Sequence, residues 1–397
     1  MSSRRTFLIG SVAIAGGFAI GYRIYSNTEQ EKAVPHLSNT DVTITPYVIV
    51  GQDGIAIITP RAEMGQGIHS TLATLVAEEL DIAVSQVRVE HGQASNLYAN
   101  NFMFPVRREN WKKRVRKALT TDAKRDSRQL TGAQSSIRDG YIKMRKAGAA
   151  ARQVLIAAAA NKWGVSPELL STSSGMVVNA NGEKLSYEEL APLAAAMEPP
   201  ENPPLKAPED WQYLGTSQPR IDMEPKCKGT AEYAIDVKVP GMLYGVARMN
   251  PYLGGSMLSY QAEQALEMKG VKRIIPLRNG IVVVATNTWY AAEAAKKVDI
   301  KWEQAAYPSS SDGHRSVISE AAASEPYSLP RNDGNVDQEF ESTQKIEGEY
   351  WVPYLAHANM EPLNAVAWLH DGFLDIWAGT QWPTNARLLG SDISGLS

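Results

Sequence analysis

The chain has 397 residues, a length that predicts two or three domains. Hydrophobic residues make up 44% and charged residues 21%, the balance of a soluble globular protein, and the net charge of −3 gives no electrostatic basis for nucleic-acid binding. The single cysteine, Cys227, excludes an intrachain disulfide. It also excludes an iron–sulfur cluster held by this chain alone, because a cluster needs several thiolates.

The N-terminus carries an arginine pair, Arg4 and Arg5, followed by an apolar run over residues 9–22. This pattern is typical of a twin-arginine export signal, and the run is shorter than the about 20 apolar residues of a membrane span. No A-x-A cleavage motif is evident, which favours an uncleaved anchor. The pattern predicts a periplasmic protein. The alternative is an arginine pair beside a buried helix.

Residues 42–50 and 55–58 predict two strands joined by a hairpin turn. The stretch that follows, residues 58–81, reads ITPRAEMGQGIHSTLATLVAEELD. Apolar residues at helical spacing in its second half predict a helix. A glycine turn therefore opens a helix.

Gly65 and Gly67 flank Gln66 and predict a turn that a ligand can approach closely. The first amides of a helix are unpaired and favour an anion, and the Gln66 amide can both donate and accept. This combination suits a phosphate-bearing heterocyclic cofactor. A lone GxG pattern more often marks only a tight turn before a packed helix.

EMGQG followed by a helix ending in EELD resembles the molybdopterin-binding segment of the xanthine dehydrogenase/aldehyde oxidase family. The order of segments is similar to the large (beta) subunit of isoquinoline 1-oxidoreductase-type enzymes. The resemblance implies a molybdenum-molybdopterin cofactor, as the cytosine dinucleotide, bound in part by Gly65, Gln66 and Gly67.

Val87, Val89 and His91 predict a strand that ends at Gly92, and a structural role is favoured over a metal role for His91. Residues 110–128 are strongly basic and predict a solvated surface, with docking of an acidic partner as the alternative. An alanine-rich helix is predicted over residues 144–163, with Gly164 as its C-cap.

Ser135 and Ser136 stand where N-caps belong, and capping alone could explain them. In the resembled family, the corresponding serine-rich turn touches the phosphate or nucleotide part of the cofactor. The resemblance therefore implies that Ser135 and Ser136 bind the cofactor, so that two helix starts converge on one anionic ligand.

Residues 176–178 and 184–185 predict a small hairpin, residues 187–196 a short helix, and the proline-dense residues 199–204 a stiff connector. Residues 228–245 resemble the opening of the family's hammerhead domain. Strands and helices alternate from there to residue 302, which predicts a compact α+β domain. The polar region through Phe340 predicts a loop with a weak helix.

MEP at residues 360–362 precedes a predicted strand over 365–369, and a second strand over 375–381 ends in GTQ. In the family, the glutamine at this position lies next to the metal and contacts its apical oxygen, a role that the resemblance gives to Gln381. The alternative is a strand-end amide that satisfies local backbone. Glu361 is expected to be structural.

The family's glycine-rich GGGFGG loop and its general-base glutamate do not occur up to Ser397. No catalytic residue and no metal ligand is therefore assigned, and the resemblance implies a C-terminally truncated subunit. The predicted fold class is α+β, a molybdopterin-binding portion plus a hammerhead-like domain. The predicted domains are a signal or anchor (1–26), a linker (27–40), the N-terminal part of the molybdopterin-binding domain (41–197), a proline-rich connector (198–220), the hammerhead-like domain (221–308), a loop region (309–345) and the start of the next molybdopterin-binding domain (346–397).

The resemblance implies a molybdenum hydroxylase that oxidises N-heterocycles or aldehydes with water as the oxygen source. Electrons would pass to a separate [2Fe-2S] subunit and then to a cytochrome c, and this chain alone is expected to be inactive. One alternative is a non-catalytic binding or assembly module. Another is an exported dehydrogenase that uses a quinone cofactor.

Overall fold

The computed structural model describes residues 41–102, 128–325 and 333–396. The predicted leader and linker, and all of the basic segment except Arg128, lie outside these described residues. Within them, no helix combines the length and the apolar character needed to cross a membrane. The chain divides into two compact units, one of residues 1–237 with 363–397 and one of residues 238–362.

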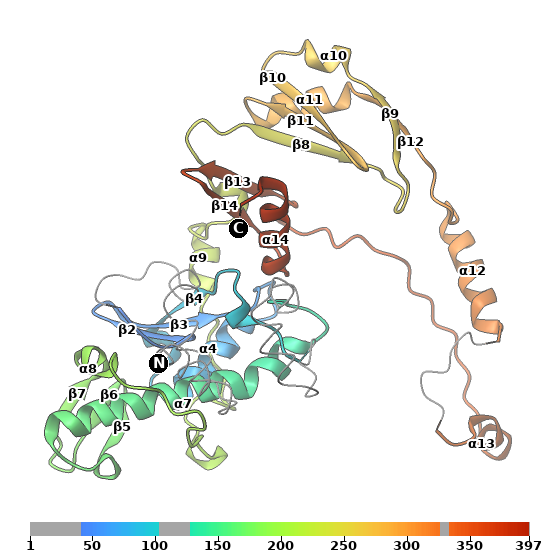
Figure 1. The fold of residues 1–397 in the computed structure, drawn as a ribbon. Coiled ribbons are helices and arrows are strands. Elements are labelled where there is room, and N and C mark those ends of the chain that lie inside the picture. Colours follow the sequence, from blue (N-terminus) through green and yellow to red (C-terminus); the bar gives the residue numbers. More distant parts are fainter. Residues whose placement is uncertain (1–40, 103–127, 326–332, 397) are drawn as a thin grey trace, which may run out of the picture. The chain divides into compact units, whose positions relative to one another are not determined.

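The first unit is built on a four-stranded sheet in the order β1-β2-β3-β4 (Figure 1). Strands β1 to β3 are antiparallel neighbours, whereas β4 lies parallel to β3, and helix α4 makes the crossover between them. The predicted single strand over residues 42–50 is wrong, because a turn at Pro46 and Tyr47 splits it; proline fixes φ and lacks an amide donor. The bounds are β1 Val42–Thr45, β2 Val48–Gly51, β3 Gly54–Thr59, α4 Ile68–Glu79 and β4 Val87–His91.

The remaining elements of the first unit flank this sheet or follow it in the chain. The helix predicted from residue 144 begins nine residues earlier, at Ser135, and its predicted C-cap is confirmed, because Gly164 has φ 67° and donates to the Ala160 carbonyl. The predicted strand over 375–381 ends at Ala378, so Gln381 lies in the loop before the last helix. The bounds are α7 Ser135–Trp163, β5 Ser171–Ser173, β6 Met176–Val178, β7 Lys184–Ser186, α8 Tyr187–Ala194, α9 Met223–Lys228, β13 Ala365–His370, β14 Phe373–Ala378 and α14 Pro383–Ser394.

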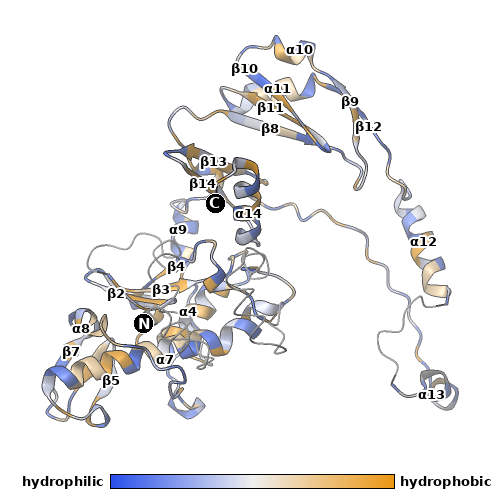
Figure 2. Ribbon diagram, in the orientation of Figure 1, coloured by the Kyte–Doolittle hydropathy of each residue, from blue (hydrophilic) through white to orange (hydrophobic). Residues whose placement is uncertain are grey.

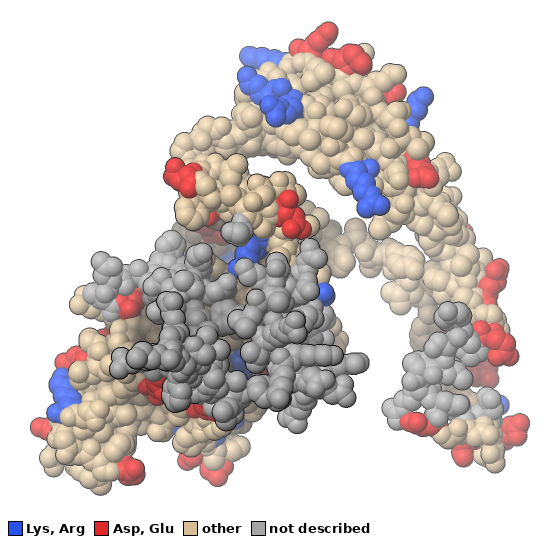
Figure 3. Space-filling model, in the orientation of Figure 1, with Lys and Arg blue, Asp and Glu red and all other residues tan. Residues whose placement is uncertain are grey.

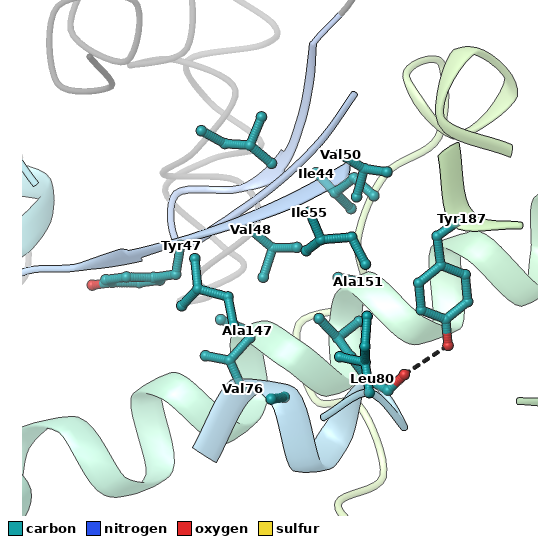
Figure 4. Packing of buried hydrophobic residues seen from close by; sticks show 14 of the residues in the cluster. Ile44, Tyr47, Val48, Val50, Ile55, Val76, Leu80, Ala147, Ala151 and Tyr187 are labelled. Atoms are coloured by element: carbon teal, nitrogen blue, oxygen red, sulfur yellow. Dashed lines mark hydrogen bonds between the residues drawn. The ribbon is translucent and has the colours of Figure 1, made fainter. Parts of the chain in front are cut away.

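The core of this unit lies between the sheet and helices α4, α7 and α8 (Figure 4). Strands β2 and β3 supply an almost unbroken apolar run, which the hydropathy colouring makes visible (Figure 2). The buried Tyr187 closes the far side of the core and donates a 2.8 Å hydrogen bond to the Leu80 carbonyl. The core therefore fixes α4 and α7 against the sheet that leads into the Gln66 turn.

Helices α4 and α7 approach each other closely at two glycines. A Cβ on Gly140 would lie 2.6 Å from the Leu72 side chain, and a Cβ on Gly148 would lie 2.6 Å from the Val76 carbonyl oxygen. Since the contacts advance in the same direction along both helices, the helices run roughly parallel. Their N-termini therefore lie at the same end of the unit.

We expect Gly148→Ala to destabilise the first unit by about 2 kcal/mol, because the new methyl group meets Val76 backbone, which cannot rotate away. This cost outweighs the about 1 kcal/mol that alanine gains over glycine in helix propensity. Gly140→Ala is the matched control, since it meets only the end of the Leu72 side chain. Urea unfolding of both variants checks the difference, and equal midpoints would contradict it.

The second unit is a mixed helix-and-strand unit whose three-stranded antiparallel sheet has the order β10-β11-β8. Helix α11 packs on it through buried alanines, and β9 pairs with β12. The predicted α+β class is confirmed. The region predicted as a loop with a weak helix holds two helices, α12 and α13. The bounds are β8 Tyr244–Met249, β9 Met257–Gln261, α10 Glu263–Leu266, β10 Val271–Leu277, β11 Gly280–Ala285, α11 Thr288–Lys296, β12 Asp299–Trp302, α12 Ser311–Ala323 and α13 Val336–Ser342.

Both signs of charge are interspersed on the face of the molecule drawn in Figure 3. Lysine and arginine do not gather there into one basic stripe among the described residues, which are the coloured part of that view. The surface in view therefore gives no more support for nucleic-acid binding than the net charge of the sequence does.

Candidate functional site

Four segments of the first unit meet at the carboxyl ends of the parallel strands β3 and β4. They are residues 60–67, 92–100, 128–135 and 380–384, and hydrogen bonds from two residues of the third segment hold them together. The carboxyl ends of parallel strands are where ligands commonly bind in sheets with helical crossovers. This convergence defines the candidate site.

Gln129 joins three of these segments through one buried side chain, only 1% exposed. Its Nε2 donates to the carbonyls of Pro60 (3.3 Å) and Gly92 (3.0 Å), and its Oε1 accepts from the Ser95 amide (3.1 Å). Its own backbone amide donates to Thr384 Oγ1 at 3.2 Å. Sequence reasoning missed Gln129, because a lone glutamine next to a basic segment carries no pattern.

Thr131 connects the predicted glutamines. Its amide donates to the Gln381 carbonyl at 2.9 Å, and its carbonyl accepts from Gln381 Nε2 at 2.8 Å. Its hydroxyl oxygen accepts from the Ala62 amide at 2.8 Å, and the Ala62 carbonyl accepts from Gln66 Nε2 at 2.9 Å. The structure therefore brings Gln66 and Gln381 into one hydrogen-bond network, although 315 residues separate them in the sequence.

The prediction that Ser135 and Ser136 are N-caps is wrong. Helix α7 is preceded by Gln134, which has φ 54° and makes no side-chain cap, so Ser135 and Ser136 are the first two residues of the helix itself. Ser135 is fully buried; its hydroxyl donates to the Gly132 carbonyl and accepts from Asn100 Nδ2, both at 2.6 Å. Ser135 therefore braces the turn, whereas the half-buried Ser136 stays nearer the surface.

The glycine turn before α4 already holds an anion of its own. Glu63 Oε1 accepts from the amides of Gly65 (2.8 Å) and Gly67 (3.0 Å), and its Oε2 accepts from the His69 amide (3.1 Å). Burial raises the pKa of Glu63, but these three amide bonds lower it by more, so the net pKa lies below its ordinary value. The turn favours an anion, as its sequence predicts, and here the anion is a side chain.

The backbone of the turn is nevertheless open on its outer face. Gly65 and Gly67 have φ of +100° and +80°, and a Cβ built on either would meet no atom within 4 Å. A cofactor could therefore approach the backbone closely. Binding of a phosphate by the two glycine amides themselves stays a prediction, and it requires Glu63 to leave them.

Arg61 is a buried residue beside the site, only 1% exposed, and its contacts hold the surrounding segments in place. Its guanidinium donates to the carbonyls of Pro60 (2.9 Å) and Tyr98 (2.8 Å) and pairs with Asp139 on α7. Lys143 also pairs with Asp139, at 2.7 Å; burial lowers the pKa of Lys143 and that carboxylate partly offsets the effect. An arginine after an apolar strand gives no sequence signal of such burial.

Two histidines lie together beside the turn, with ring centroids 5.6 Å apart. His69 Nε2 lies 2.7 Å from the Arg61 carbonyl oxygen. Burial lowers the pKa of His69. Burial of the ring also lowers the pKa of His91, although part of this residue is solvent-accessible, and the neighbouring His69 is a second cause. Both rings are therefore neutral at pH 7, and among residues with described positions no three His, Cys, Asp or Glu side chains form a metal-holding group.

Comparisons with known proteins place this site in a family. Two family models, both described as a molybdopterin cofactor-binding domain, match residues 15–102 and 320–397. The first match contains the Gln66 turn and the loop after β4, and the second contains Gln381. The chain belongs to the xanthine dehydrogenase/aldehyde oxidase family, as a molybdopterin-binding subunit. The predicted family is thereby confirmed.

Three relatives of this molybdopterin-binding subunit are similar over most of its length. The B subunit of nicotinate dehydrogenase from Pseudomonas putida is 28% identical over 88% of this chain and 28% of the relative. The beta subunit of isoquinoline 1-oxidoreductase from Brevundimonas diminuta is 27% identical over 100% of this chain and 54% of the relative. Membrane-bound aldehyde dehydrogenase (pyrroloquinoline-quinone) of Gluconacetobacter polyoxogenes is 29% identical over 98% of this chain and 49% of the relative. The chain therefore spans about half, or less, of the length of these relatives.

The groups on the open side of the site fit a molybdopterin cofactor in kind. Gln66 and Gln381 are exposed neutral amides, Ser136 offers a half-buried hydroxyl, and the turn offers an open glycine backbone. Each is an uncharged hydrogen-bonding group, suited to a ligand that brings its own charge. The fixed charges of the site, Arg61 and Glu63, are instead paired within the protein.

Proposed function

We propose that this chain forms one side of the cofactor site in the large subunit of a molybdenum hydroxylase. The observation that carries the proposal is the network from Gln66 through Ala62 and Thr131 to Gln381, which joins the two matched molybdopterin-binding segments. When bound, the cofactor supplies the oxidation of the substrate, with water as the source of oxygen. The chain supplies position and hydrogen bonds.

The two glutamines have separate tasks in this proposal. Gln381 spends one N–H on Thr131 and keeps a second N–H and its Oε1, so it can contact the ligand of the metal without adding charge. Both polar atoms of the Gln66 side chain form a hydrogen bond within its own turn: Oε1 accepts from the Met64 amide at 2.6 Å, and one N–H of Nε2 donates to the Ala62 carbonyl. Gln66 therefore presents its remaining N–H from a fixed position. The Ser136 hydroxyl would reach the phosphate or nucleotide part.

The names of the relatives support the substrate class. Two of them act on N-heterocycles by name and the third on aldehydes, and we extend both classes to this chain. Cys227 alone cannot hold an iron–sulfur cluster, and the proposal gives electron acceptance to a separate [2Fe-2S] subunit and then to a cytochrome c. The cofactor is the cytosine dinucleotide form. Export to the periplasm by the twin-arginine route would carry the folded, loaded protein.

A quinone-dependent dehydrogenase is the second candidate function. One observation favours it, the pyrroloquinoline-quinone in the name of the Gluconacetobacter relative. Both matched family models favour molybdopterin instead. A binding or assembly module without a cofactor is the third, non-catalytic candidate.

The test is cofactor analysis of the protein purified with its native partners. We expect molybdenum and pterin at about one per chain. Gln381→Ala should lower their retention about two- to tenfold, the worth of one net hydrogen bond, whereas Gln52→Ala, on an exposed hairpin turn, should leave it unchanged. Quinone absorbance without molybdenum would replace the proposal by the second candidate. A monodisperse protein without either cofactor would replace it by the third.

A further inference from the structure

The Gln66 turn, residues 62–67, is held from outside by an arginine that lies 155 residues after Gly65 in the chain. Arg220 donates through one terminal nitrogen to the Gly65 carbonyl at 2.6 Å and through the other to Glu63 Oε1 at 3.3 Å. One guanidinium therefore contacts both the backbone of the turn and the carboxylate that fills it. A planar fork of donors suits such a double contact better than a lysine ammonium would.

Arg220 is itself oriented by its neighbours. Asp222 accepts from its Nε (3.0 Å) and from one terminal nitrogen (2.7 Å), a two-point pair that fixes the guanidinium plane. The Ile221 amide donates to Ser70 Oγ in the first turn of α4 at 3.1 Å, which anchors this segment beside the turn. The segment that ends the proline-rich connector therefore lies against the site.

Glu63 transmits this hold to the backbone. Its side chain is 7% exposed and bonds three amides that follow it, so the path of residues 65–69 depends on the position of one carboxylate. Gln66 sits in the middle of that path, and its side chain closes back onto the same turn. A shift of Glu63 must therefore shift Gln66.

We infer that Arg220 and Glu63 are positioning residues, which hold the Gln66 turn in the shape that presents Gln66 to the cofactor. The inference deepens the proposed function and rests on it. Neither residue needs to touch the cofactor. Their effect passes through the Gly65 carbonyl and the amides of Gly65, Gly67 and His69.

Hydrogen exchange of the full chain without cofactor tests the hold directly. Arg220→Ala should raise the exchange rate of the Gly65, Gly67 and His69 amides roughly threefold or more, because an opening that the arginine opposes becomes more frequent. Millimolar guanidinium should restore slow exchange in this variant, and Arg220→Lys should lie between the two. Glu63→Gln should raise exchange further, and adding Arg220→Ala to it should change little more. Arg88→Ala, which removes a partly exposed arginine paired with Glu90, should leave the turn unchanged.

Two outcomes would overturn the inference. One is unchanged exchange of the turn in Arg220→Ala, and the other is an equal rise throughout α4 and α7, which would mean general destabilisation. Because this experiment needs no cofactor, its failure is distinct from that of the proposed function, which fails if the wild-type protein carries no molybdenum. In the loaded protein, Arg220→Ala should lower molybdenum retention, and guanidinium should restore it.

Discussion

Gln129→Ala is expected to destabilise the first unit by about 3 kcal/mol. The truncation leaves the Gly92 carbonyl and the Ser95 amide without their side-chain partner, whereas the Pro60 carbonyl keeps its bond from Arg61. Buried polar groups left unpaired cost about 1–3 kcal/mol each, and water entering the vacated space recovers part of this. Urea unfolding measures the loss, and cofactor retention should fall with it, because the ends of β3 and β4 are no longer tied together.

Gln129→Glu separates the hydrogen bonds from the volume of the side chain. A carboxylate of nearly the same size still accepts from Ser95, but it cannot donate to the two carbonyls and places a charge among them. We expect it to be at least as destabilising as alanine. The exposed Gln52→Ala should stay within about 0.5 kcal/mol of the wild-type protein. A Gln129→Glu protein as stable as wild type would show that the carbonyls do not depend on this donor.

The local part of the site could be predicted from the sequence. Glycine spacing predicted the turn at Gln66, apolar periodicity predicted the helix after it, and Gly164 marked the end of α7. Each of these signals lies within a few residues of the feature that it determines, and left-handed glycines carry their meaning locally. The strand predicted to end at Gly92 is present and ends one residue earlier, at His91.

The long-range part could not be predicted. Gln129 pairs with Thr384 across 255 residues, and Thr131 pairs with Gln381 across 250. No periodicity in the intervening sequence records such contacts. The serine caps failed by one residue, because Gln134 adopts a left-handed conformation that asparagine or glycine would have signalled and glutamine does not.

The anion at the glycine turn shows a third kind of limit. The sequence correctly predicted that amides at this helix start favour a negative group, but it offered two candidates, a cofactor phosphate and Glu63, the acid of the EMGQG motif itself. Only the structure shows that the second one is bound. The EMGQG motif is therefore better described as a turn whose amides bind its own glutamate and which presents Gln66 than as an unoccupied phosphate-binding site.

Glu78→Ala is expected to destabilise the first unit by about 3–5 kcal/mol, the usual cost of removing one partner from a buried charged network. Glu78 is buried near the end of α4 and accepts from Lys206 Nζ at 3.3 Å. It also accepts from three consecutive amides of the connector, those of Gln212 (3.1 Å), Tyr213 (2.7 Å) and Leu214 (3.0 Å). Without the carboxylate, those amides and the lysine lose an acceptor that water can replace only in part. Urea unfolding at pH 7 measures the loss.

The pH dependence follows from the direction of the Glu78 pKa shift. Burial raises this pKa, but the three amides and then Lys206 lower it by more, so the folded pKa lies below the unfolded value of about 4.3. The stabilisation by Glu78 is therefore complete above that value and is lost as the pH falls through the folded pKa. The stability difference between wild type and Glu78→Gln should be constant above about pH 6 and should shrink below about pH 4.

The exposed Glu224→Gln, whose side chain is 75% exposed, should show no comparable difference at any pH. A gap between wild type and Glu78→Gln that widened on acidification would reverse the sign argued here. Glu78 holds residues 206–214 of the proline-rich connector at the end of α4. Arg220, at the end of the same connector, bonds the turn before the start of α4, so the connector is attached near both ends of this helix. Glu78→Ala should therefore also speed hydrogen exchange at the Gln66 turn, which lies more than 10 residues before Glu78 in the sequence.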